Sequence, residues 1–319
     1  MQAILLSILL ASAATAAAAE TRVQEYRLPE GITAHDVWAD PHPGGPVWFS
    51  GQRSGDAGRL DPKTGKVELV ALGRSAAPHG VILDRDGSVF LTDGGRNAIV
   101  RVDARTREVK SWPLPSGTRY ANLNTGAFDG AGIYWFTGQS GIYGRLDPRS
   151  GDMKVFEAPR GPGPYGIHAT PDGTVFFASL AGSYIARIDA ATWQAQVIEP
   201  PTPDQGARRV WSDSKGMLWV AEWNAGQLGR YDPKTGAWKS WKAPGEQPRV
   251  YAVYVDETDR PWVSEWTSQR MLRFDPASGK WDAFRSSSRS ANVRQIHGRK
   301  GEVWTPESAA DKIVVYRYK

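Results

Sequence analysis

The sequence predicts an all-β protein, a seven-bladed β-propeller with four strands in each blade. One observation is a bulky aromatic residue that recurs every 41 to 45 residues inside a short apolar strand. A second is a strand and turn phrase of the type GRLDPKTG that follows most of these aromatics. Short strands at this period are typical of propeller blades, whereas helical repeats would show apolar residues with a 3.6-residue period. The 34 Gly and 22 Pro residues suit a chain of many turns.

The chain begins with an apolar run followed by small residues. Residues 1–19 read MQAILLSILLASAATAAAA, with Ala17 and Ala19 in the A-x-A positions that precede a signal-peptide cleavage site. We expect residues 1–19 to be a signal peptide and residues 20–319 to be the propeller, exported to a periplasm or outside the cell. An uncleaved anchor is the alternative, although the apolar run is shorter than the roughly 20 residues of a membrane span. We expect no membrane attachment after signal removal.

One aromatic residue marks the second strand of each predicted blade. The seven positions are Trp48, Phe90, Trp135, Phe176, Trp219, Trp262 and Trp304. Six of the third strands end in Asp followed by Pro or Ala, which is the chemistry of a tight turn. These residues are Asp61, Asp103, Asp147, Asp189, Asp232 and Asp275. Because they recur in the repeats, we interpret them as turn residues rather than metal ligands.

The last repeat lacks one strand. The chain stops at Tyr318 and Lys319, after the third strand of that repeat, while the segment from Val23 to Leu28 resembles the outer strands of other repeats. We predict that this N-terminal strand completes the last blade, which would close the ring and leave no unpaired sheet edge.

Propellers bind ligands at the mouth of the central channel, where equivalent positions of all blades meet. The starts of the seven inner strands are His35, His79, Asn124, Tyr165, Arg208, Tyr251 and Arg294, and the ends of the second strands are Gly51, Asp93, Gly138, Ser179, Glu222, Glu265 and Glu307. One hypothesis is a pocket in which carboxylates hold a divalent cation while Arg and Tyr orient an anionic or carbonyl-bearing ligand. The alternative is a ring of Arg–Glu pairs and waters that only satisfies the channel lining. His168 and His297 fit packing better than ligation.

The formal charge of +5 and the pI near 9.3 are modest for this length. Lys and Arg are spread along the chain, so we do not expect nucleic-acid binding. No Cys is present, so no disulfide stabilises the exported protein. We expect a monomer.

Several blade phrases carry a family resemblance, among them APHGVILDRDGSVFLTD, GPYGIHATPDGTVFFAS and KGMLWVAEWNAGQLGRYD. They resemble the virginiamycin B lyase (streptogramin B lyase) family, whose blades repeat P-x-G-I, then D-G-x-V-W-F-T-E, then I-G-R-I. The resemblance covers essentially the whole chain after the signal. It implies a seven-bladed propeller and a Mg²⁺-dependent carbon–oxygen lyase, in which a His base removes an α-proton and a cyclic depsipeptide ester opens by β-elimination.

The resemblance places the family's functional positions on other residue types in this chain. The family's His base falls on Arg294, its metal-binding Glu on Asn292, and its blade-six His on Tyr251, while its last carboxylate is retained as Glu307. Arg has a pKa above about 12 and cannot be a general base near neutral pH, and Asn is a weaker metal ligand than Glu. Lyase chemistry by the family mechanism is therefore in doubt.

The candidate site follows from these positions. Arg294, Glu307 and Tyr251 are the candidate catalytic residues, and Glu307 and Glu265 the candidate Mg²⁺ ligands. The candidate ligand-binding residues are Arg208, Glu222, Glu265, Tyr165, His79, Asn124 and Asn292. A site rotated around the ring to His35, His79 and Asp93 is an alternative.

Three functions remain open from the sequence. The first is an exported lyase-like propeller that binds a small or peptidic ligand and whose chemistry has diverged. The second is a retained lyase, or a hydrolase of an ester or lactone, although seven repeats disfavour the six-bladed lactonase architecture. The third is a non-catalytic platform for protein partners.

Overall fold

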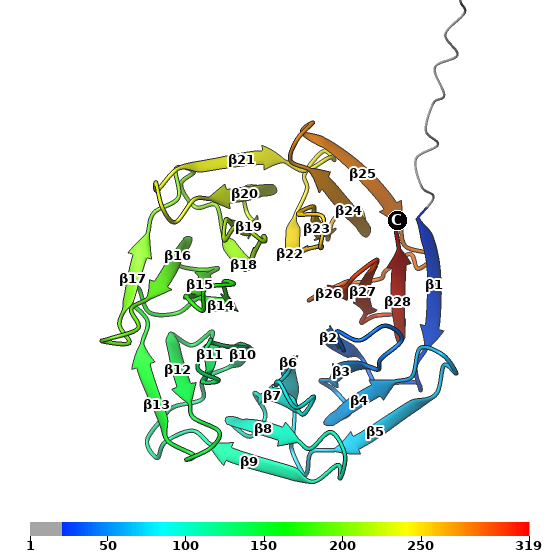
Figure 1. Ribbon diagram of the computed structural model, residues 1–319, viewed down its shortest axis with the longest axis vertical. Helices are drawn as coiled ribbons and strands as arrows, with labels where there is room; N and C mark the ends of the chain where they lie inside the picture. Colours follow the sequence, from blue (N-terminus) through cyan, green and yellow to red (C-terminus); the bar gives the residue numbers. More distant parts are fainter. Residues whose placement is uncertain (1–20, 319) are drawn as a thin grey trace, which may run out of the picture.

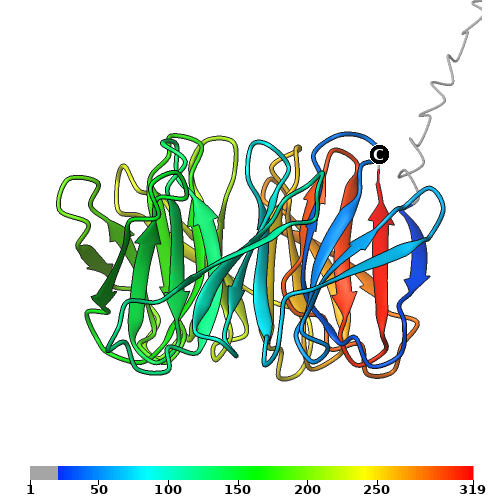
Figure 2. The same ribbon diagram turned by 90° about the horizontal axis from the view of Figure 1, so that it is seen from below.

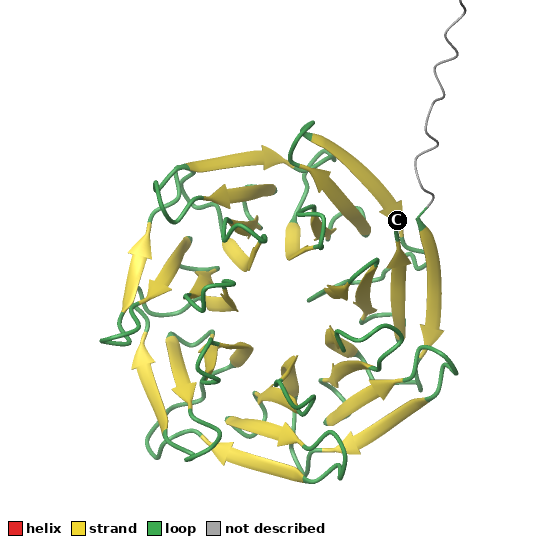
Figure 3. Cartoon of the chain, in the orientation of Figure 1, coloured by secondary structure: helices red, strands yellow, loops and turns green. Residues whose placement is uncertain are grey.

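The structure, a computed structural model, describes residues 21–318. Twenty-eight strands form seven antiparallel four-stranded sheets arranged in a ring (Figure 1). The part of the chain that the structure describes consists of strands, turns and loops and holds no helix (Figure 3). No helix that could cross a membrane is therefore found among these residues. The predicted signal peptide lies outside the described residues.

Each blade runs from an inner strand at the channel to an outer strand at the rim. Blades one to three comprise β2 (Ala34–Ala39), β3 (Val47–Gly51), β4 (Asp56–Leu60), β5 (Val67–Ala71); β6 (Pro78–Leu83), β7 (Val89–Asp93), β8 (Ala98–Val102), β9 (Val109–Pro113); β10 (Leu123–Phe128), β11 (Tyr134–Gly138), β12 (Ile142–Leu146) and β13 (Met153–Glu157). Blades four to six comprise β14 (Pro164–Ala169), β15 (Val175–Ser179), β16 (Tyr184–Ile188), β17 (Ala195–Ile198); β18 (Ala207–Ser212), β19 (Leu218–Glu222), β20 (Gln227–Tyr231), β21 (Trp238–Lys242); β22 (Val250–Val255), β23 (Pro261–Glu265), β24 (Arg270–Asp275) and β25 (Lys280–Arg285). Blade seven comprises β26 (His297–Arg299), β27 (Glu302–Glu307), β28 (Lys312–Arg317) and the N-terminal β1 (Arg22–Arg27).

The N-terminal strand closes the ring, as the sequence predicts. β1 pairs antiparallel with β28 along its full length, from Arg22 opposite Arg317 to Arg27 opposite Lys312. At the channel, a parallel bridge between Asp36 and Gln295 joins the inner parts of blades one and seven. The two ends of the propeller therefore share backbone hydrogen bonds at both the rim and the channel, and no outer strand is missing from the seventh blade (Figure 1).

Some of the repeated tryptophans bond to the turn of their own blade. The indole N–H groups of Trp135 and Trp262 each donate a hydrogen bond to an Asp six residues earlier, Asp129 and Asp256, at 2.8 Å. The Gly of the GRLD phrase is required by close packing, because a Cβ at Gly58 would lie 2.0 Å from the Phe49 ring.

The repeated Asp residues are turn residues, which confirms their interpretation from the sequence. Asp61 is typical, since it accepts a hydrogen bond from the backbone N–H of Lys63 at 2.9 Å and another from the Thr64 hydroxyl at 2.9 Å. Such bonds fix the tight connection between the third and outer strands of the blade.

Hydroxyl groups on the second strands position the channel mouth. The side chains of Ser50, Thr92 and Thr137 each donate a hydrogen bond to an inner-strand carbonyl of the next blade, on His79, Asn124 and Tyr165 respectively. The three acceptors are themselves mouth residues of the inner strands. Neighbouring blades are thus locked together at the residues whose side chains form the candidate site, and the strands run from this face to the opposite one (Figure 2).

Candidate functional site

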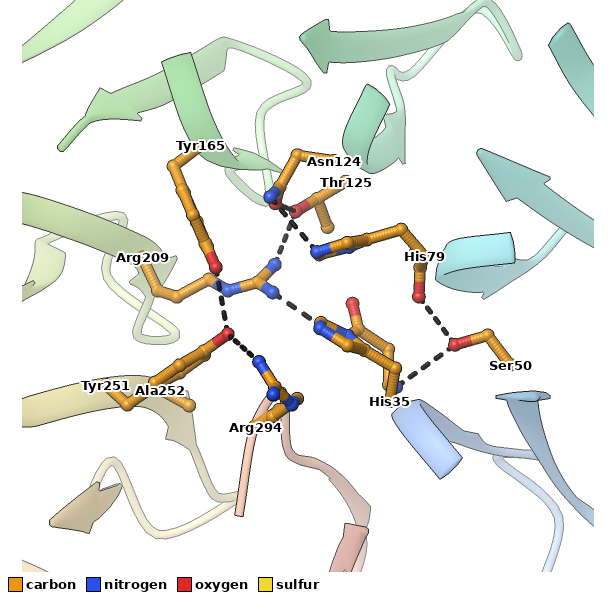
Figure 4. Close-up of polar contacts among 12 residues, drawn as sticks. His35, Ser50, His79, Asn124, Thr125, Tyr165, Arg209, Tyr251, Ala252 and Arg294 are labelled. Atoms are coloured by element: carbon orange, nitrogen blue, oxygen red, sulfur yellow. Dashed lines mark hydrogen bonds and ion pairs between the residues drawn. The ribbon is translucent and has the colours of Figure 1, made fainter. Parts of the chain in front are cut away.

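The inner-strand residues converge at one mouth of the channel (Figure 4). The His35 and His79 rings have centroids 3.8 Å apart, and the Asn124 amide nitrogen lies 3.3 Å from His79 Nε2. Across the channel, the hydroxyl groups of Tyr165 and Tyr251 are 2.8 Å apart. Side chains from different blades therefore form one continuous cluster.

Guanidinium groups cover the tyrosine half of this mouth. The Arg208 guanidinium lies 3.6 Å from the Tyr251 ring centroid and 4.4 Å from that of Trp223, and it donates to the Tyr165 hydroxyl at 2.8 Å. Arg294 donates to the Tyr251 hydroxyl at 3.4 Å. These cations rest on aromatic faces rather than on Glu side chains, so the ring of Arg–Glu pairs considered from the sequence is not formed by the described residues.

The cations change the acidity of Tyr251. Burial by itself would raise the pKa of this hydroxyl, but the nearby charges of Arg208, Arg209 and Arg294 outweigh burial and lower the pKa to about 8. The pKa of Tyr165 moves the other way, to about 12, chiefly because of burial. Tyr251 is therefore the more acidic of the two hydroxyls: it ionises as the pH rises through about 8, and Tyr165 then donates the shared hydrogen bond to the phenolate.

Several hydrogen-bond donors at the mouth have no acceptor. Among the described residues, the buried Nε–H groups of Arg208, Arg209 and Arg294 find no partner, and neither does His79 Nδ1. One buried acceptor, Asp36 Oδ2, is also unpaired there. The mouth therefore holds more donor groups than acceptors, with three guanidinium groups and one carboxylate, Asp36, among its described residues.

Arg209 crosses the channel beneath the mouth. Its guanidinium comes from blade five, donates to Thr125 Oγ1 of blade three, and lies 3.5 Å from Asp36 Oδ1 of blade one. Asp36 also contacts His35 Nδ1 at 2.7 Å. Burial lowers the pKa of both His35 and His79 well below the usual value and raises the pKa of Asp36. The two imidazoles are therefore neutral at physiological pH.

Asp36 and Arg209 were not predicted as site residues, because the strict alternation of a regular strand would turn one residue of each adjacent pair away from the channel. The register of β2 on β3 shifts between Ala34 and Val37, and that of β18 on β19 shifts between Ala207 and Arg209. Such a bulge lets consecutive residues point to the same side. The adjacent polar pairs His35–Asp36 and Arg208–Arg209 were the available signal.

Aromatic side chains close the channel beyond Arg209. Trp38 of blade one and Trp211 of blade five approach across the axis with ring centroids 6.0 Å apart. His297 stacks on Trp38 at 3.6 Å, and His168 stacks on Trp211 at 4.1 Å. The packing role predicted for the two histidines is confirmed. Aromatic side chains therefore lie directly beneath the polar cluster of the mouth.

Glu222 lies away from the mouth cluster. Its side chain runs over Gly229 of the neighbouring strand, where a Cβ would be 2.1 Å from Glu222 Oε1. The same oxygen accepts hydrogen bonds from Trp238 Nε1 at 3.1 Å and Ser240 Oγ at 2.9 Å on the outer strand. Glu222 thus points toward the rim inside blade five.

Glu265 is occupied by its own loops. Its carboxylate accepts backbone N–H bonds from Arg249 and Thr267, both at 2.9 Å, and from Ser268 at 2.8 Å. This pattern organises the turn after the second strand of blade six, in the way that Asp side chains cap tight turns. Its oxygens are directed at backbone donors rather than at the channel cluster.

Glu307 and Asn292 are also held by local partners. Glu307 accepts hydrogen bonds from the hydroxyls of Ser286 and Ser288. The Asn292 backbone N–H donates to the side chain of Gln269, and the Gln269 amide donates back to Asn292 Oδ1 at 3.4 Å. The structure therefore brings together Tyr165, Arg208, Tyr251, Arg294, His79 and Asn124, and it does not bring Glu222, Glu265, Glu307 or Asn292 into that cluster.

These contacts do not fit the Mg²⁺ site that the family resemblance implies. Mg²⁺ requires a compact set of oxygen ligands, whereas Glu265 and Glu307 are each surrounded by their own donors. Within residues 21–318, the group of side chains that could share a metal ion is instead His35, Asp36 and His79. Two imidazole nitrogens and one carboxylate beside a guanidinium do not suit Mg²⁺.

The fold and the channel define a seven-bladed β-propeller, closed by its N-terminal strand, with a basic and aromatic mouth. A family model described as the Virginiamycin B lyase family matches residues 10–234, more than half of the chain. The protein belongs to the Virginiamycin B lyase family.

Solved structures agree on the fold. A streptogramin B lyase superposes with a TM-score of 0.85 at 20% identity, covering 94% of this chain and 98% of that one. A catalytically inactive variant of virginiamycin B lyase from Staphylococcus aureus, solved with quinupristin, gives 0.85 at 21% identity, covering 94% and 100%. The extracellular domain of a two-component system protein from B. thetaiotaomicron gives 0.72 at 14% identity, covering 93% and 40%. No curated protein sequence matches this chain.

Proposed function

We propose that this protein is an exported propeller that binds a small or peptidic ligand at the channel mouth through a carboxylate or carbonyl group. The observation that carries the proposal is the convergence of three guanidinium groups, those of Arg208, Arg209 and Arg294, on one cluster. A carboxylate supplies two acceptor atoms and a negative charge, and hydrogen bonds between guanidinium and carboxylate are among the strongest in proteins.

The charge of the mouth favours an anion over a cation. Arg208, Arg209 and Arg294 face the cluster, and Asp36 is the one carboxylate paired with any of them in the part of the chain that the structure describes. The imidazoles of His35 and His79 are neutral and add no compensating charge. A cation would therefore meet a net positive site, whereas an anion would be attracted to it.

Calorimetric titration with citrate and with hippurate, an N-acylated amino acid, tests this proposal. We expect binding that Arg294→Ala weakens by about tenfold, which corresponds to about 1.4 kcal/mol. Arg105→Ala, an exposed residue on a distant turn, is the control and should leave affinity unchanged. Equal affinities in the two variants would place the ligand elsewhere. Capture of a protein partner that survives Arg294→Ala would support the interaction platform instead.

A second candidate function, carbon–oxygen lyase activity, is favoured by the lowered pKa of Tyr251. In this mechanism the Tyr251 phenolate takes the proton from the carbon next to a carbonyl. The electron pair of that C–H bond forms a carbon–carbon double bond, and the ester C–O bond at the adjacent carbon breaks and releases a carboxylate. Arg208 and Arg294 stabilise the developing negative charge on oxygen. Tyr251 thus takes the role that the family gives to His.

Quinupristin, the compound present in one related structure, is a suitable substrate to test for this activity. Elimination opens the ring without changing the mass, whereas hydrolysis adds one water, so mass spectrometry with fragmentation separates a lyase from an esterase. Tyr251→Phe should abolish turnover while retaining citrate binding. Turnover that persists in Tyr251→Phe would exclude this residue as the base.

We also propose that the protein is exported. Residues 1–19 would be removed as a signal peptide, and the mature chain from residue 20 would act as a monomer without membrane attachment. N-terminal sequencing of the protein from a periplasmic or culture fraction should start at Glu20. Recovery of the full-length chain in the membrane fraction would contradict it.

A further inference from the structure

The face opposite the mouth carries a cavity with a volume of about 710 Å³. We call it the aromatic groove. Its lining includes the side chains of Trp38, Leu83, Phe90, Trp112, Phe128 and His297. It starts at the aromatic end of the channel and extends to β9 at the rim of blade two and to the turn after β12 in blade three, the neighbouring blades in Figure 1.

Flat aromatic surfaces dominate the outer part of the groove. The Phe90 and Trp112 rings are nearly parallel, at 12° with centroids 6.0 Å apart, and Phe128 meets Phe90 edge-on at 5.0 Å. Trp112 and Phe128 are half-buried, so part of each side chain remains available to a ligand. An aromatic ligand can extend this stack, because aromatic rings attract one another beyond the effect of burying their area.

Cationic side chains border the aromatic wall. Arg101 and Arg149 are balanced by ion pairs with Asp103 and Asp147. Lys110 instead lies 4.7 Å from the Trp112 ring centroid.

Arg85 donates to the carbonyl of Gly130 at 2.8 Å. Neither Arg85 nor Lys110 has a carboxylate within ion-pair distance among residues 21–318. Of the charged residues that line the groove, four are cationic (Arg85, Arg101, Lys110 and Arg149) and two are acidic (Asp84 and Asp86), so cations outnumber acids along its border.

The groove is separate from the mouth. Arg209 spans the channel between blades five, three and one, and Trp38 and Trp211 meet across the axis below it. A ligand in the groove touches Trp38 from the far side and cannot reach Tyr251 or Arg294 without moving this layer. Ligand binding at the groove and at the mouth can therefore be tested independently.

We propose that the aromatic groove is a second binding site, and that its ligand is a small aromatic anion such as an aryl carboxylate or aryl sulfonate. The ring would lie against Trp112 and Phe128, and the acidic group would meet Lys110 and Arg85. The volume falls within the roughly 300 to 1,000 Å³ of small-molecule pockets.

Blade five offers a matched control for this site. Lys239 lies 4.7 Å from the Trp241 ring centroid, which repeats the arrangement of Lys110 and Trp112 on another outer strand. Trp241 stacks on Trp219 at 5.7 Å, as Trp112 stacks on Phe90. The blade-five pair does not line the groove. Lys239→Glu and Trp241→Leu therefore report what loss of the same local contacts does to the fold.

The experiment is a fluorescence titration of the full-length mature protein with 8-anilinonaphthalene-1-sulfonate, with N-phenyl-1-naphthylamine as the uncharged analogue. We expect the sulfonate to bind more tightly than the amine, and Lys110→Glu and Trp112→Leu each to weaken sulfonate binding by about tenfold. Lys239→Glu, Trp241→Leu and the mouth variant Arg294→Ala should bind like the parent protein. Near-ultraviolet circular dichroism checks that each variant keeps native packing.

Two results would overturn the proposal. If Lys110→Glu and Lys239→Glu bind the sulfonate equally, the probe does not occupy the groove. If the uncharged amine binds as tightly as the sulfonate, and Lys110→Glu leaves both affinities unchanged, the cationic side chains do not favour an anionic ligand. Displacement of the sulfonate by citrate, with loss of binding in Arg294→Ala, would assign the probe to the mouth.

Discussion

We predict that ionisation of the Glu222 carboxyl group lowers the stability of the folded protein as the pH rises from 4 to 8. The carboxyl group is fully buried. Burial raises its pKa from 4.5 to about 7, against the opposing effect of hydrogen bonds from Ser240 and Trp238. The folded protein thus binds this proton more tightly than the unfolded chain does. The stabilisation that comes from this tighter proton binding is fully present below pH 4.5, and it is lost as the pH rises through about 7.

The size of the effect follows from the pKa shift. Each pKa unit corresponds to about 1.4 kcal/mol, so ionisation of Glu222 should lower the free energy of unfolding by roughly 3 kcal/mol between pH 4 and pH 8. Glu222→Gln removes the titration. Its amide oxygen can replace Oε1 as acceptor for Trp238 and Ser240, and its amide nitrogen takes the place of Oε2, which has no partner among the described residues.

Urea unfolding of the parent and Glu222→Gln proteins at pH 4 to 8, followed by tryptophan fluorescence and circular dichroism, measures the difference. The variant should match the parent at pH 4 and be more stable by roughly 3 kcal/mol at pH 8, with the same m value. The exposed Glu157→Gln is the control and should follow the parent. Parallel pH profiles for the parent and Glu222→Gln, or a less stable variant at pH 8, would refute the reasoning.

Four further predictions concern the channel and the closure. If the lyase mechanism operates, turnover should rise with pH through about 8, because Tyr251 is the base and must be deprotonated; a profile flat from pH 6 to 9 would contradict it. Arg209→Met should lower the free energy of unfolding by roughly 3 kcal/mol, because it leaves Asp36 buried without its cation; calorimetry checks this, and an unchanged thermal midpoint would show that the crossing contact is not stabilising. Removal of residues 22–27 should expose the edge of β28 and cause association, detectable by light scattering, unlike removal of residues 1–19. Mg²⁺ at millimolar concentration should not raise the thermal midpoint, since the carboxylates needed to hold it are bound to local donors; a clear rise would contradict this placement.

Much of the fold was predictable because it repeats. The recurrence of aromatic residues from Trp48 to Trp304 located the second strand of each blade. The last repeat lacked an outer strand, and this indicated Val23–Leu28 as its replacement. The structure places that strand at Arg22–Arg27, paired with β28. Such features depend on local periodicity, which a sequence shows directly.

The candidate site was predictable only in part. Inner-strand positions such as Tyr251 and Arg294 meet at the mouth because symmetry brings equivalent positions together. The directions in which the side chains at the ends of the second strands point were harder to predict. Glu222 turns outward because Gly229 leaves space beside it, and Glu265 turns toward backbone N–H groups of its own loop. These side-chain directions depend on the space beside a glycine and on the positions of backbone N–H groups, which the type of residue alone does not reveal.

By itself, the sequence determined the number of blades, their order and the closing strand, since these follow from a repeated pattern of strand and turn residues. Only the tertiary structure decided which polar side chains share the mouth, because inner-strand bulges bring Asp36 and Arg209 into the channel beside His35 and Arg208. The same packing set the charge of the mouth: three guanidinium groups gather there, while the glutamates are bound elsewhere. Electrostatics at a site depends on distances in space, and residues that are far apart in the chain set those distances.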